Sequence, residues 1–257
     1  MNWFPEPRLS EAEICSEAPA GCRDSGPTEW STANRYGDAI ESFLKGPSFN
    51  RDGALYVTDI PHGRVFRVSR ERSWTLVSQF DGWPNGLKID SDGRIFIADR
   101  KQGLIELDPS TGKMSPHRGS LRTEGFKRLN DLHIALIGNI YMTDQGQTGP
   151  QEPSGRIYRL TTDGRLECLL TIGVSPNGIV VTPDEQVMFV AMTRSSQIWR
   201  VPISGDAIMA KANLFCQRPV VSGDWTHTVY RHVASCGRVP GGLSASASED
   251  VTIRSSS

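Results

Sequence analysis

Three asparagines recur at nearly equal spacing, and their residue type suits two kinds of role. Asn85, Asn130 and Asn177 each stand at the start of a short apolar run. Amide oxygens that converge on one point are hard ligands suited to Ca²⁺, provided that carboxylates add charge. Asparagine beside glycine also adopts turn conformations readily. The residue types leave both interpretations open, a ligand set and a series of structural turns.

Each asparagine opens a repeated unit made of short apolar runs separated by turns. The clearest copy begins at Pro84, turns at Asp92-Gly93 and ends at Asp99. The heads of the copies lie about 45 residues apart, which is the period of a propeller blade. Runs of β-forming residues joined by Asp-Gly predict hairpins, and four strands per repeat predict blades. A β-sandwich, the rival all-β fold, would not need an asparagine repeated at a fixed place.

The sequence therefore predicts an all-β fold, a β-propeller of the six-bladed type with about four recognisable blades. In such a fold the inner strand of each blade lines a central channel, so the residue that opens it points at the axis. The expected blades cover residues 47–82, 83–120, 128–173 and 175–217.

The remaining residues divide into two flanking segments. Residues 1–37 are polar and proline-rich, and we expect an irregular N-terminal arm with one short helix over residues 10–16. The propeller region is expected over residues 38–217. Residues 218–257 are atypical and end in a serine-rich stretch, which predicts a disordered tail.

Composition excludes several classes of function. The 257 residues carry a net charge of −1, which gives no electrostatic footprint for nucleic acid or an anionic membrane. No stretch approaches the roughly 18 apolar residues of a membrane span. The first residues lack the apolar core of a secretory signal. The five cysteines are scattered and odd in number, so we expect reduced thiols and a cytoplasmic protein.

Other polar residues favour structural roles. His133 lies in an inner strand and is expected to be a satisfied core or channel histidine more often than a ligand. Asp59, Asp99 and Asp144 each end the second strand of a repeat, where aspartate bonds turn amides. The Ser195-Ser196 pair lacks a flanking glycine elbow, so serine-hydrolase chemistry has no support.

Five short motifs occur in a characteristic order. They are Gly46-Pro47-Ser48-Phe49, Trp83-Pro84-Asn85-Gly86-Leu87, Leu129-Asn130-Asp131, Thr143-Asp144-Gln145-Gly146-Gln147-Thr148-Gly149 and Ser175-Pro176-Asn177-Gly178. In this order and spacing they resemble the gluconolactonase/regucalcin (senescence-marker-protein) family, and most closely its lactonase-like branch. The resemblance covers residues 38–217.

The resemblance implies a six-bladed propeller with one divalent metal in its channel, usually Ca²⁺ and sometimes Zn²⁺ or Mg²⁺. It implies hydrolysis of sugar lactones and related esters, with a metal that polarises the carbonyl and a channel carboxylate that acts as base or nucleophile. Asn130 and Asn177 match the family's metal-binding asparagines. Asn85 and Asn130 are the implied substrate-binding residues, and Asp131 and Asp224 are weak candidates for the catalytic carboxylate.

Two departures from the family pattern bear on activity. Lys45 stands where the family has a glutamate before Gly-Pro, and the family's later Pro-Asp-Gly motif is absent, with only Asp224 near its place. Neutral amides alone bind Ca²⁺ weakly. The sequence therefore supports two hypotheses: a metal-dependent hydrolase of small lactones or esters, in which the metal is weak or absent, and a non-catalytic incomplete propeller that acts as a binding module or degenerate homologue. An incomplete ring would also invite self-association through open sheet edges.

Overall fold

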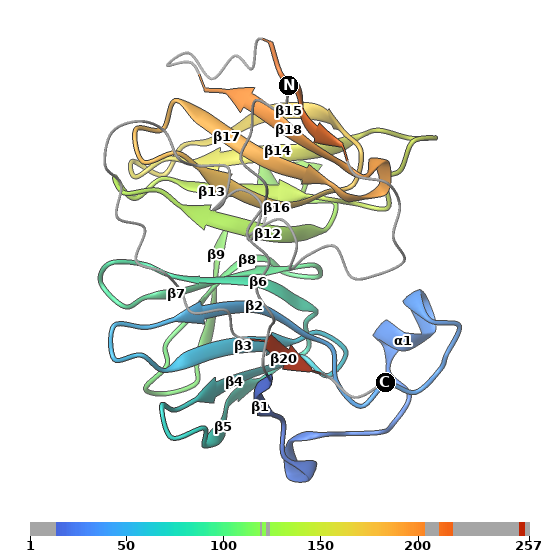
Figure 1. Ribbon diagram of the computed structural model, residues 1–257, viewed down its shortest axis with the longest axis vertical. Helices are drawn as coiled ribbons and strands as arrows, with labels where there is room; N and C mark the ends of the chain where they lie inside the picture. The colour runs from blue at the N-terminus through green and yellow to red at the C-terminus, as the bar shows by residue number, and fades with distance from the viewer. Residues whose placement is uncertain (1–13, 119, 122–123, 204–210, 218–251, 255–257) are drawn as a thin grey trace, which may run out of the picture.

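Four antiparallel sheets of four strands make up most of the structure (Figure 1). The computed structural model describes residues 14–118, 120–121, 124–203, 211–217 and 252–254. The first blade consists of β2 (Leu44–Phe49), β3 (Leu55–Asp59), β4 (Arg64–Val68) and β5 (Trp74–Gln79). The second consists of β6 (Pro84–Ile89), β7 (Ile95–Asp99), β8 (Gly103–Leu107) and β9 (Met114–Arg118). The third consists of β12 (Leu129–Ile134), β13 (Ile140–Asp144), β14 (Gly155–Leu160) and β15 (Leu166–Gly173), and the fourth of β16 (Pro176–Val181), β17 (Val187–Met192), β18 (Gln197–Pro202) and β19 (Asn213–Gln217).

The prediction of an all-β propeller with about four recognisable blades is confirmed. Within each sheet, consecutive strands pair in sequence order, as in a meander. The inner strands β2, β6, β12 and β16 contact one another in that order. Figure 1 shows the sheets layered in the same order along the long axis of the molecule. A short hairpin of β10 (Ser120–Leu121) and β11 (Glu124–Gly125) lies between the second and third blades in the chain.

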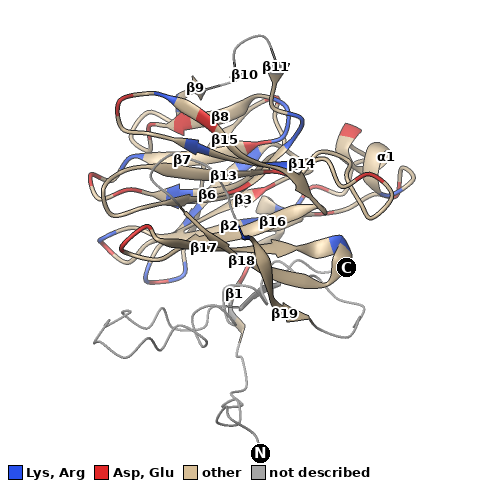
Figure 2. Cartoon of the chain, turned by 90° about the horizontal axis from the view of Figure 1, so that it is seen from above, with Lys and Arg blue, Asp and Glu red and all other residues tan. Residues whose placement is uncertain are grey.

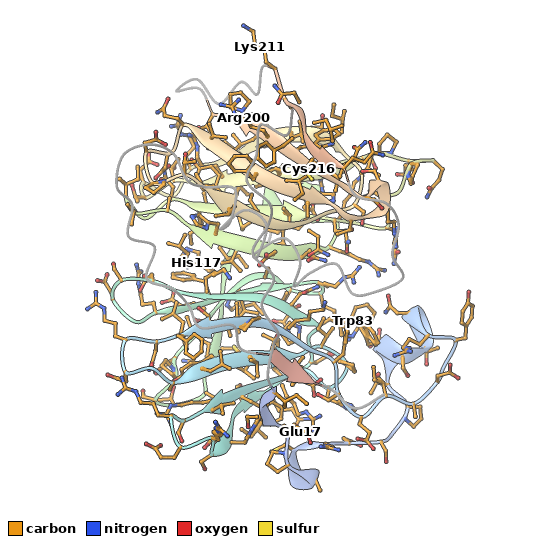
Figure 3. The ribbon with its side chains drawn as sticks, viewed as in Figure 1. Glu17, Trp83, His117, Arg200, Lys211 and Cys216 are labelled. Atoms are coloured by element: carbon orange, nitrogen blue, oxygen red, sulfur yellow. The ribbon has the colours of Figure 1, made fainter. Side chains whose placement is uncertain are left out.

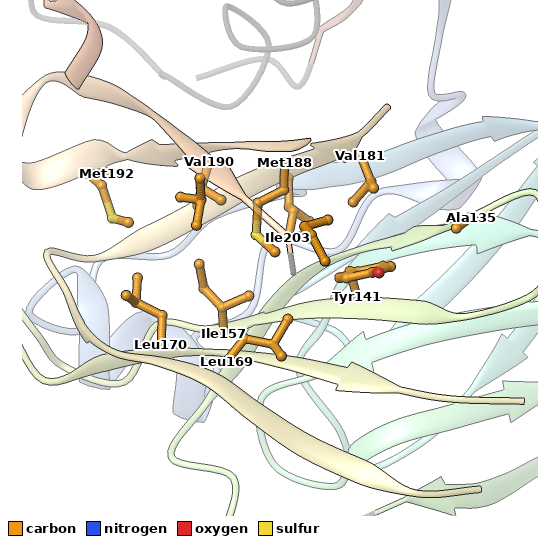
Figure 4. Packing of buried hydrophobic residues seen from close by; sticks show 12 residues of the cluster. Ala135, Tyr141, Ile157, Leu169, Leu170, Val181, Met188, Val190, Met192 and Ile203 are labelled. Carbon is orange, nitrogen blue, oxygen red and sulfur yellow. The ribbon is translucent and has the colours of Figure 1, made fainter. Parts of the chain in front are cut away.

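Apolar residues fill the spaces between neighbouring blades. On β17, every second residue (Met188, Val190 and Met192) is fully buried. These side chains pack against Ile157 and Leu170 of the third blade (Figure 4). Strand side chains alternate between the two faces of a sheet, so this spacing of two places them all on the same face. Each such side chain contributes about 1.5–3 kcal/mol when it is removed from water, and this burial holds the blades together.

A β-bulge interrupts the beginning of every inner strand. The pairing register shifts between Lys45 and Ser48 on β2, and between Pro84 and Leu87 on β6. The same shift follows Leu129 on β12 and Pro176 on β16. Bulges bend a strand and redirect a side chain, and they often occur next to functional sites. The bulges fall on the motifs that contain the repeated asparagines.

The N-terminal arm contains regular structure and covers one end of the first two blades. The helix α1 (Glu29–Asn34) is capped by Thr28, whose side chain accepts a hydrogen bond from the backbone of Ser31. Trp30 of this helix packs with Ile60 and Trp83. Figure 3 shows Trp83 at the end of the sheets that faces α1.

The expectation of a helix over residues 10–16 is wrong where the structure describes it. Ile14–Glu17 forms a strand, β1, which pairs in parallel with β20 (Thr252–Arg254). Its partner lies more than 200 residues away in the sequence, so no local pattern could reveal the pairing. Residues 10–13, and residues 218–257 apart from β20, lie outside the described part of the chain. The expected disorder of that tail therefore remains a prediction.

Charged residues of both signs alternate around the turns at the ends of the sheets (Figure 2), in keeping with a net charge of −1. Within the described ranges, no helix has the length and apolar character needed to cross a membrane. Three cysteines in the same ranges, Cys22, Cys168 and Cys216, are free.

Candidate functional site at the mouth of the propeller

The four inner strands each place one residue at an equivalent position. In every blade the first residue of the inner strand pairs with the last residue of the second strand. The residue that follows therefore occupies an equivalent position in each blade. It lies inside the bulge in the last three blades, whereas Lys45 of the first blade still pairs with Thr58 directly before the bulge. These four equivalent residues are Lys45, Asn85, Asn130 and Asn177. We call the end of the sheets at which the inner strands begin the mouth.

Glycine allows neighbouring inner strands to approach closely at the mouth. A Cβ atom on Gly46 would lie 2.5 Å from the backbone nitrogen of Leu87. A Cβ atom on Gly86 would lie 2.4 Å from Oδ1 of Asp131 and 2.7 Å from its Cα. Real Cβ atoms do not make contacts this short, so the glycines of the Gly-Pro and Pro-Asn-Gly motifs fix the spacing between blades. Asn85 and Gly86 lie inside the strand β6, at its bulge, so the interpretation of this Asn-Gly pair as a turn is wrong.

A threonine hydroxyl fixes the backbone of two of the asparagines. Thr58 of the first blade donates a hydrogen bond to the carbonyl oxygen of Asn85 in the second, at 2.7 Å. Thr143 of the third blade donates in the same way to the carbonyl of Asn177 in the fourth, also at 2.7 Å. The equivalent residue in the second blade is Ala98, which has no hydroxyl to offer Asn130.

Asn130 is oriented through its side chain instead. Its Nδ2 donates to Oε1 of Gln145 at 2.9 Å, and Nε2 of Gln145 donates to Oγ of Ser175 at 2.7 Å. The backbone nitrogen of Ser175 donates to Oγ1 of Thr148 at 3.0 Å. These four side chains are buried, and they link the third blade to the fourth. The chain of bonds fixes which way the Asn130 amide points.

The fixed amide leaves one buried oxygen available. Oδ1 of Asn130 has no hydrogen-bond partner among the described residues. A buried polar atom without a partner carries a free-energy cost of about 1–3 kcal/mol, so it normally has a ligand, an ion or water. Asn130 therefore offers an oriented acceptor to whatever enters the mouth.

The inner strands that carry the asparagines and Lys45 also carry Lys88 and His133. Lys45 is buried, and its ammonium nitrogen lies 4.6 Å from the centre of the Phe43 ring. Burial lowers the pKa of Lys88, and the negative charge of Asp131 opposes this shift. Burial and the charge of Lys88 lower the pKa of His133 to about 4, so this imidazole is neutral at pH 7. A neutral, partly buried histidine agrees with the core or channel role expected for it.

The aspartates that end the second strands bond backbone amides. The predicted bonds to turn amides are found for Asp99, whereas Asp59 and Asp144 bond residues that precede the inner strand of their blade. Asp59 accepts from the nitrogen of Phe43 at 2.8 Å, and Asp144 accepts from that of Arg128 at 2.6 Å. Asp99 accepts from the backbone nitrogens of Lys101 and Gln102 at 2.8 and 2.7 Å.

Two of these three aspartates also form an ion pair with a buried arginine. Arg64 forms an ion pair with Asp59 at 2.5 Å, and Arg156 forms one with Asp144 at 2.9 Å. The residue paired with Asp99 on the next strand is Gly103, so the second blade has no arginine at this place. Oδ2 of Asp99 is buried without a hydrogen-bond partner, and burial raises the pKa of this carboxyl.

The residues described at the mouth do not complete a site for a divalent cation. Oδ1 of Asn130 suits a cation ligand, but Ca²⁺ takes six to eight oxygens, usually with several carboxylates. Lys45 places an ammonium group at the position equivalent to Asn130. Across the described ranges, no group of three His, Cys, Asp or Glu side chains is placed to hold a metal ion.

The structure brings together most of the residues predicted for the site. Asn85, Asn130, Asp131 and Asn177 all lie at the beginning of inner strands, and Asp131 is buried between the second and third blades. Asp224 lies outside the described residues. Sequence reasoning did not identify Gln145 or Ser175 as functional, although both fall inside quoted motifs.

Comparisons with known proteins agree with the fold. A gluconolactonase from Zymomonas mobilis is 30% identical over 142 residues, which are 51% of this chain and 40% of that protein. A lactonase, drp35, from Staphylococcus epidermidis is 28% identical over 174 residues, which are 64% of this chain and 52% of that protein. The chain thus spans about half the length of the curated relatives it matches.

Solved structures show the same architecture. A gluconolactonase from Xanthomonas campestris superposes with a TM-score of 0.62 at 22% identity, covering 82% of this chain and 76% of that one. The calcium-binding protein regucalcin from Agrobacterium tumefaciens superposes with a TM-score of 0.58 at 21% identity, covering 82% of this chain and 68% of that one. The family profile described as SMP-30/Gluconolactonase/LRE-like region matches residues 45–221. The chain belongs to the SMP-30/gluconolactonase/LRE-like family.

Proposed function

We propose that this chain takes small lactones or esters at its mouth, as a hydrolase of its family's type, and that it holds the family's divalent cation weakly or not at all. Ca²⁺ is the expected cation, before Zn²⁺ or Mg²⁺. The observation that carries the proposal is the buried, oriented and unpartnered Oδ1 of Asn130. An acceptor held in this way is suited to a hydroxyl group of a polar ligand or to a cation.

Residues next to Asn130 supply the other interactions that a lactone needs. Asn85 is buried at the equivalent place in the neighbouring blade, and its amide can donate to a ring or carbonyl oxygen. Asp131 directly follows Asn130, and a Cβ atom on Gly86, the neighbour of Asn85, would lie 2.4 Å from its Oδ1. We therefore assign Asp131 the role of general base. Lys45 is the reason for expecting weak metal binding, because an ammonium group repels a divalent cation.

The test is hydrolysis of glucono-δ-lactone, followed by acid release in a pH-stat after subtraction of the spontaneous rate. We expect Asn130→Ala to lower kcat/KM at least about tenfold, the effect of one hydrogen bond of roughly 1.4 kcal/mol. Asn213→Ala is the matched control, because Asn213 is exposed on the outer strand β19. Equal rates for Asn130→Ala and the unmodified chain would refute the proposed site.

A second candidate function is a binding module without catalysis, and Lys45 favours it. In that case the chain would bind glucono-δ-lactone or gluconate in a calorimeter but would release acid no faster than buffer, with or without added Ca²⁺. Acid release above buffer that Asn130→Ala abolishes would exclude the binding module.

A further inference from the structure

The turn after the inner strand of the third blade differs from its three counterparts. In every blade five residues join the inner strand to the second strand: 50–54, 90–94, 135–139 and 182–186. The fourth residue of each turn has a positive φ, and its backbone nitrogen donates to the carbonyl oxygen of the first. The second and third residues are Arg51-Asp52, Ser91-Asp92 and Pro183-Asp184 in three blades, and Leu136-Ile137 in the third blade. These turns lie opposite the mouth, at the end of the sheets that we call the base.

Leu136 and Ile137 form an exposed apolar tip at the base. Their exposed fractions are 82% and 68%, the highest among the leucines and isoleucines of the described ranges. Single apolar side chains are common on protein surfaces. Two adjacent ones, at a turn where the other blades carry aspartate, instead indicate a contact with another molecule.

The tip is held in place by residues outside its own turn. In the other three turns the side chain of the first residue accepts a hydrogen bond from the backbone where the turn ends; these residues are Asn50, Asp90 and Thr182. Ala135, the first residue of the third turn, cannot do so. Instead, Nδ2 of Asn139 donates to Oε2 of Glu185 at 2.9 Å, and Oδ1 of Asn139 accepts from the backbone nitrogen of Thr162 at 3.2 Å.

The bond to Glu185 requires a disfavoured backbone conformation. Glu185 has a φ of 52°, at the place where Gly53, Gly93 and Gly138 stand in the other turns. Residues with a Cβ atom rarely adopt this left-handed conformation. The carboxylate of Glu185 also accepts from the hydroxyl of Tyr141 at 2.8 Å, so the fourth blade fixes the turn of the third. The tip is therefore preorganised, which reduces the entropy lost when it docks.

A groove lies at the base between the turns of the first two blades. Its volume is about 590 Å³, and its apolar lining consists of Phe49, Tyr56, Ile89, Ile95 and Pro109. Phe49 is 45% exposed although it ends an inner strand. An apolar cavity of about 150 Å³ already holds a benzene molecule. The groove therefore has room for two aliphatic side chains.

Charges at the groove favour a neutral occupant. Its lining carries Arg51 and three aspartates, Asp52, Asp90 and Asp92. Asp90 is paired with Arg94, and the groove keeps a net negative charge, which disfavours an acidic protein or an anionic membrane. The tip is uncharged, and the turn that borders it carries one charge of each sign, Asp163 and the 66% exposed Arg165. A second copy of this chain can thus offer its tip to the groove without repulsion.

We propose that two copies of this chain associate base to base, with the Leu136-Ile137 tip of each copy in the groove of the other. Tip and groove lie at the same end of the molecule but on different blades, so a single two-fold rotation brings both pairs together. The contact removes the aliphatic pair and Phe49 of both copies from water. The mouths face outward in such a dimer and stay open, so the inference is independent of the proposed hydrolysis.

Sedimentation velocity of the full chain over a range of concentrations tests the dimer. We expect a reversible equilibrium between monomer and dimer. Leu136→Ser combined with Ile137→Asp gives the third turn the Ser-Asp-Gly sequence of the second, and should raise the dimer Kd at least about 100-fold. Phe49→Asp, in the groove, should raise it at least about tenfold. A chain that is monomeric at every concentration, or a Kd that the double variant leaves unchanged, would overturn the inference.

Mixing the two variants tests the reciprocal geometry. Neither variant alone can form an intact pair of tip and groove. A mixture restores one such pair, between the tip of the Phe49→Asp copy and the groove of the double variant. We expect a heterodimer that is tighter than the homodimer of either variant. No gain on mixing would overturn the two-fold arrangement.

Leu214→Asp is the matched control, because Leu214 is 52% exposed on the outer strand of the fourth blade. A dimer that dissociates in Leu214→Asp and persists in the double variant would assign the association to an open sheet edge and overturn the inference. Thermal unfolding checks each fold; if the double variant does not fold, Leu136→Ser alone and Phe49→Asp decide. A monomeric chain whose tip binds phosphatidylcholine vesicles in a co-sedimentation assay would assign the tip to a membrane instead.

Discussion

Asn130 and Gln145 lie side by side in the third blade, and Nδ2 of the first donates to Oε1 of the second at 2.9 Å. Because Gln145 is itself bonded to Ser175, the amide of Asn130 cannot rotate without breaking a buried bond. The relationship explains why Oδ1 of Asn130 stays free although the residue is 4% exposed. The orientation of the Asn130 amide is thus set by a bond to the residue that follows β13 and by the link of that residue to the fourth blade.

Gln145→Ala should destabilise the protein by about 1–2 kcal/mol, because Nδ2 of Asn130 and Oγ of Ser175 lose a buried partner. Urea unfolding followed by circular dichroism measures the change. Gln186→Ala removes an exposed glutamine from the fourth blade and is the control, with an expected change within about 0.5 kcal/mol. The same loss in both variants would show that the network contributes nothing specific.

Gly86→Ala should be strongly destabilising. The added methyl group would lie 2.4 Å from Oδ1 of Asp131 and 2.7 Å from its Cα, so the second and third blades must separate. Overpacking of this kind costs about 1–3 kcal/mol, and backbone contact places this case at the upper end. Gly125→Ala is the control, since a Cβ atom there meets nothing within 4 Å. A melting temperature unchanged by Gly86→Ala would contradict the close approach of the strands.

Two aspartates at equivalent places should respond oppositely to replacement by asparagine. Asp144→Asn leaves Arg156 buried without its partner charge, and breaking such a pair costs about 3–5 kcal/mol. Asp99→Asn keeps an acceptor for the amides of Lys101 and Gln102, and it removes a carboxylate whose ionisation is unfavourable in the fold. We therefore expect the melting temperature at pH 7 to fall in the first variant and to stay level or rise in the second.

The effect of Asp99 on the pH dependence of stability follows from the direction of its pKa shift. Its folded pKa is raised above 3.8, so its contribution to stability is largest below 3.8 and is lost as the pH rises through the folded pKa. Asp99→Asn abolishes that loss. If Asp99→Asn destabilised the protein at pH 7 as much as Asp144→Asn, the carboxylate of Asp99 would have a partner that this interpretation lacks.

His133 should make the protein sensitive to mild acid. Its folded pKa of about 4 lies below the ordinary value of 6.5, so its contribution to stability is complete above pH 6.5 and is lost as the pH falls from 6.5 towards 4. At roughly 1.4 kcal/mol per pKa unit, the loss is about 3 kcal/mol. His133→Gln should remove most of this loss, measured as urea midpoints between pH 4 and 7. His117→Gln, at a partly exposed histidine of the second blade (Figure 3), should retain it. Parallel pH profiles for both variants would contradict the assignment.

The blades could be predicted from the sequence because each repeat consists of local residue patterns. Alternating residues such as Met188, Val190 and Met192 mark the strands, and Asp-Gly pairs mark the turns between them. The asparagines were predictable for the same reason, since each occupies a fixed place in the repeat. Lys45, which stands where the resembled family has a glutamate before Gly-Pro, occupies the position in the first blade that is equivalent to these asparagines.

Features that depend on distant partners could not be predicted. The strand β1 exists through pairing with β20, whose residues lie at the far end of the chain. The bonds from Asn139 and Tyr141 to Glu185 join residues of different blades that lie 46 and 44 positions apart in the sequence. The helix α1 was not predicted, although its Thr28–Ser31 capping box is a local sequence pattern. Serine is a less common partner in such a box than glutamate.

Calcium titration of the unmodified chain and of Lys45→Glu tests most directly the claim that Lys45 weakens the metal site. We expect the unmodified chain to bind Ca²⁺ at best in the millimolar range in a calorimeter. Lys45→Glu exchanges a repulsive charge for an attractive one, and two such changes of roughly 1 kcal/mol each in water should tighten binding at least about tenfold. Lys113→Glu, an exposed change of the same charge at the opposite end of the second blade, should leave the affinity unchanged. Micromolar binding of Ca²⁺ by the unmodified chain would contradict the claim.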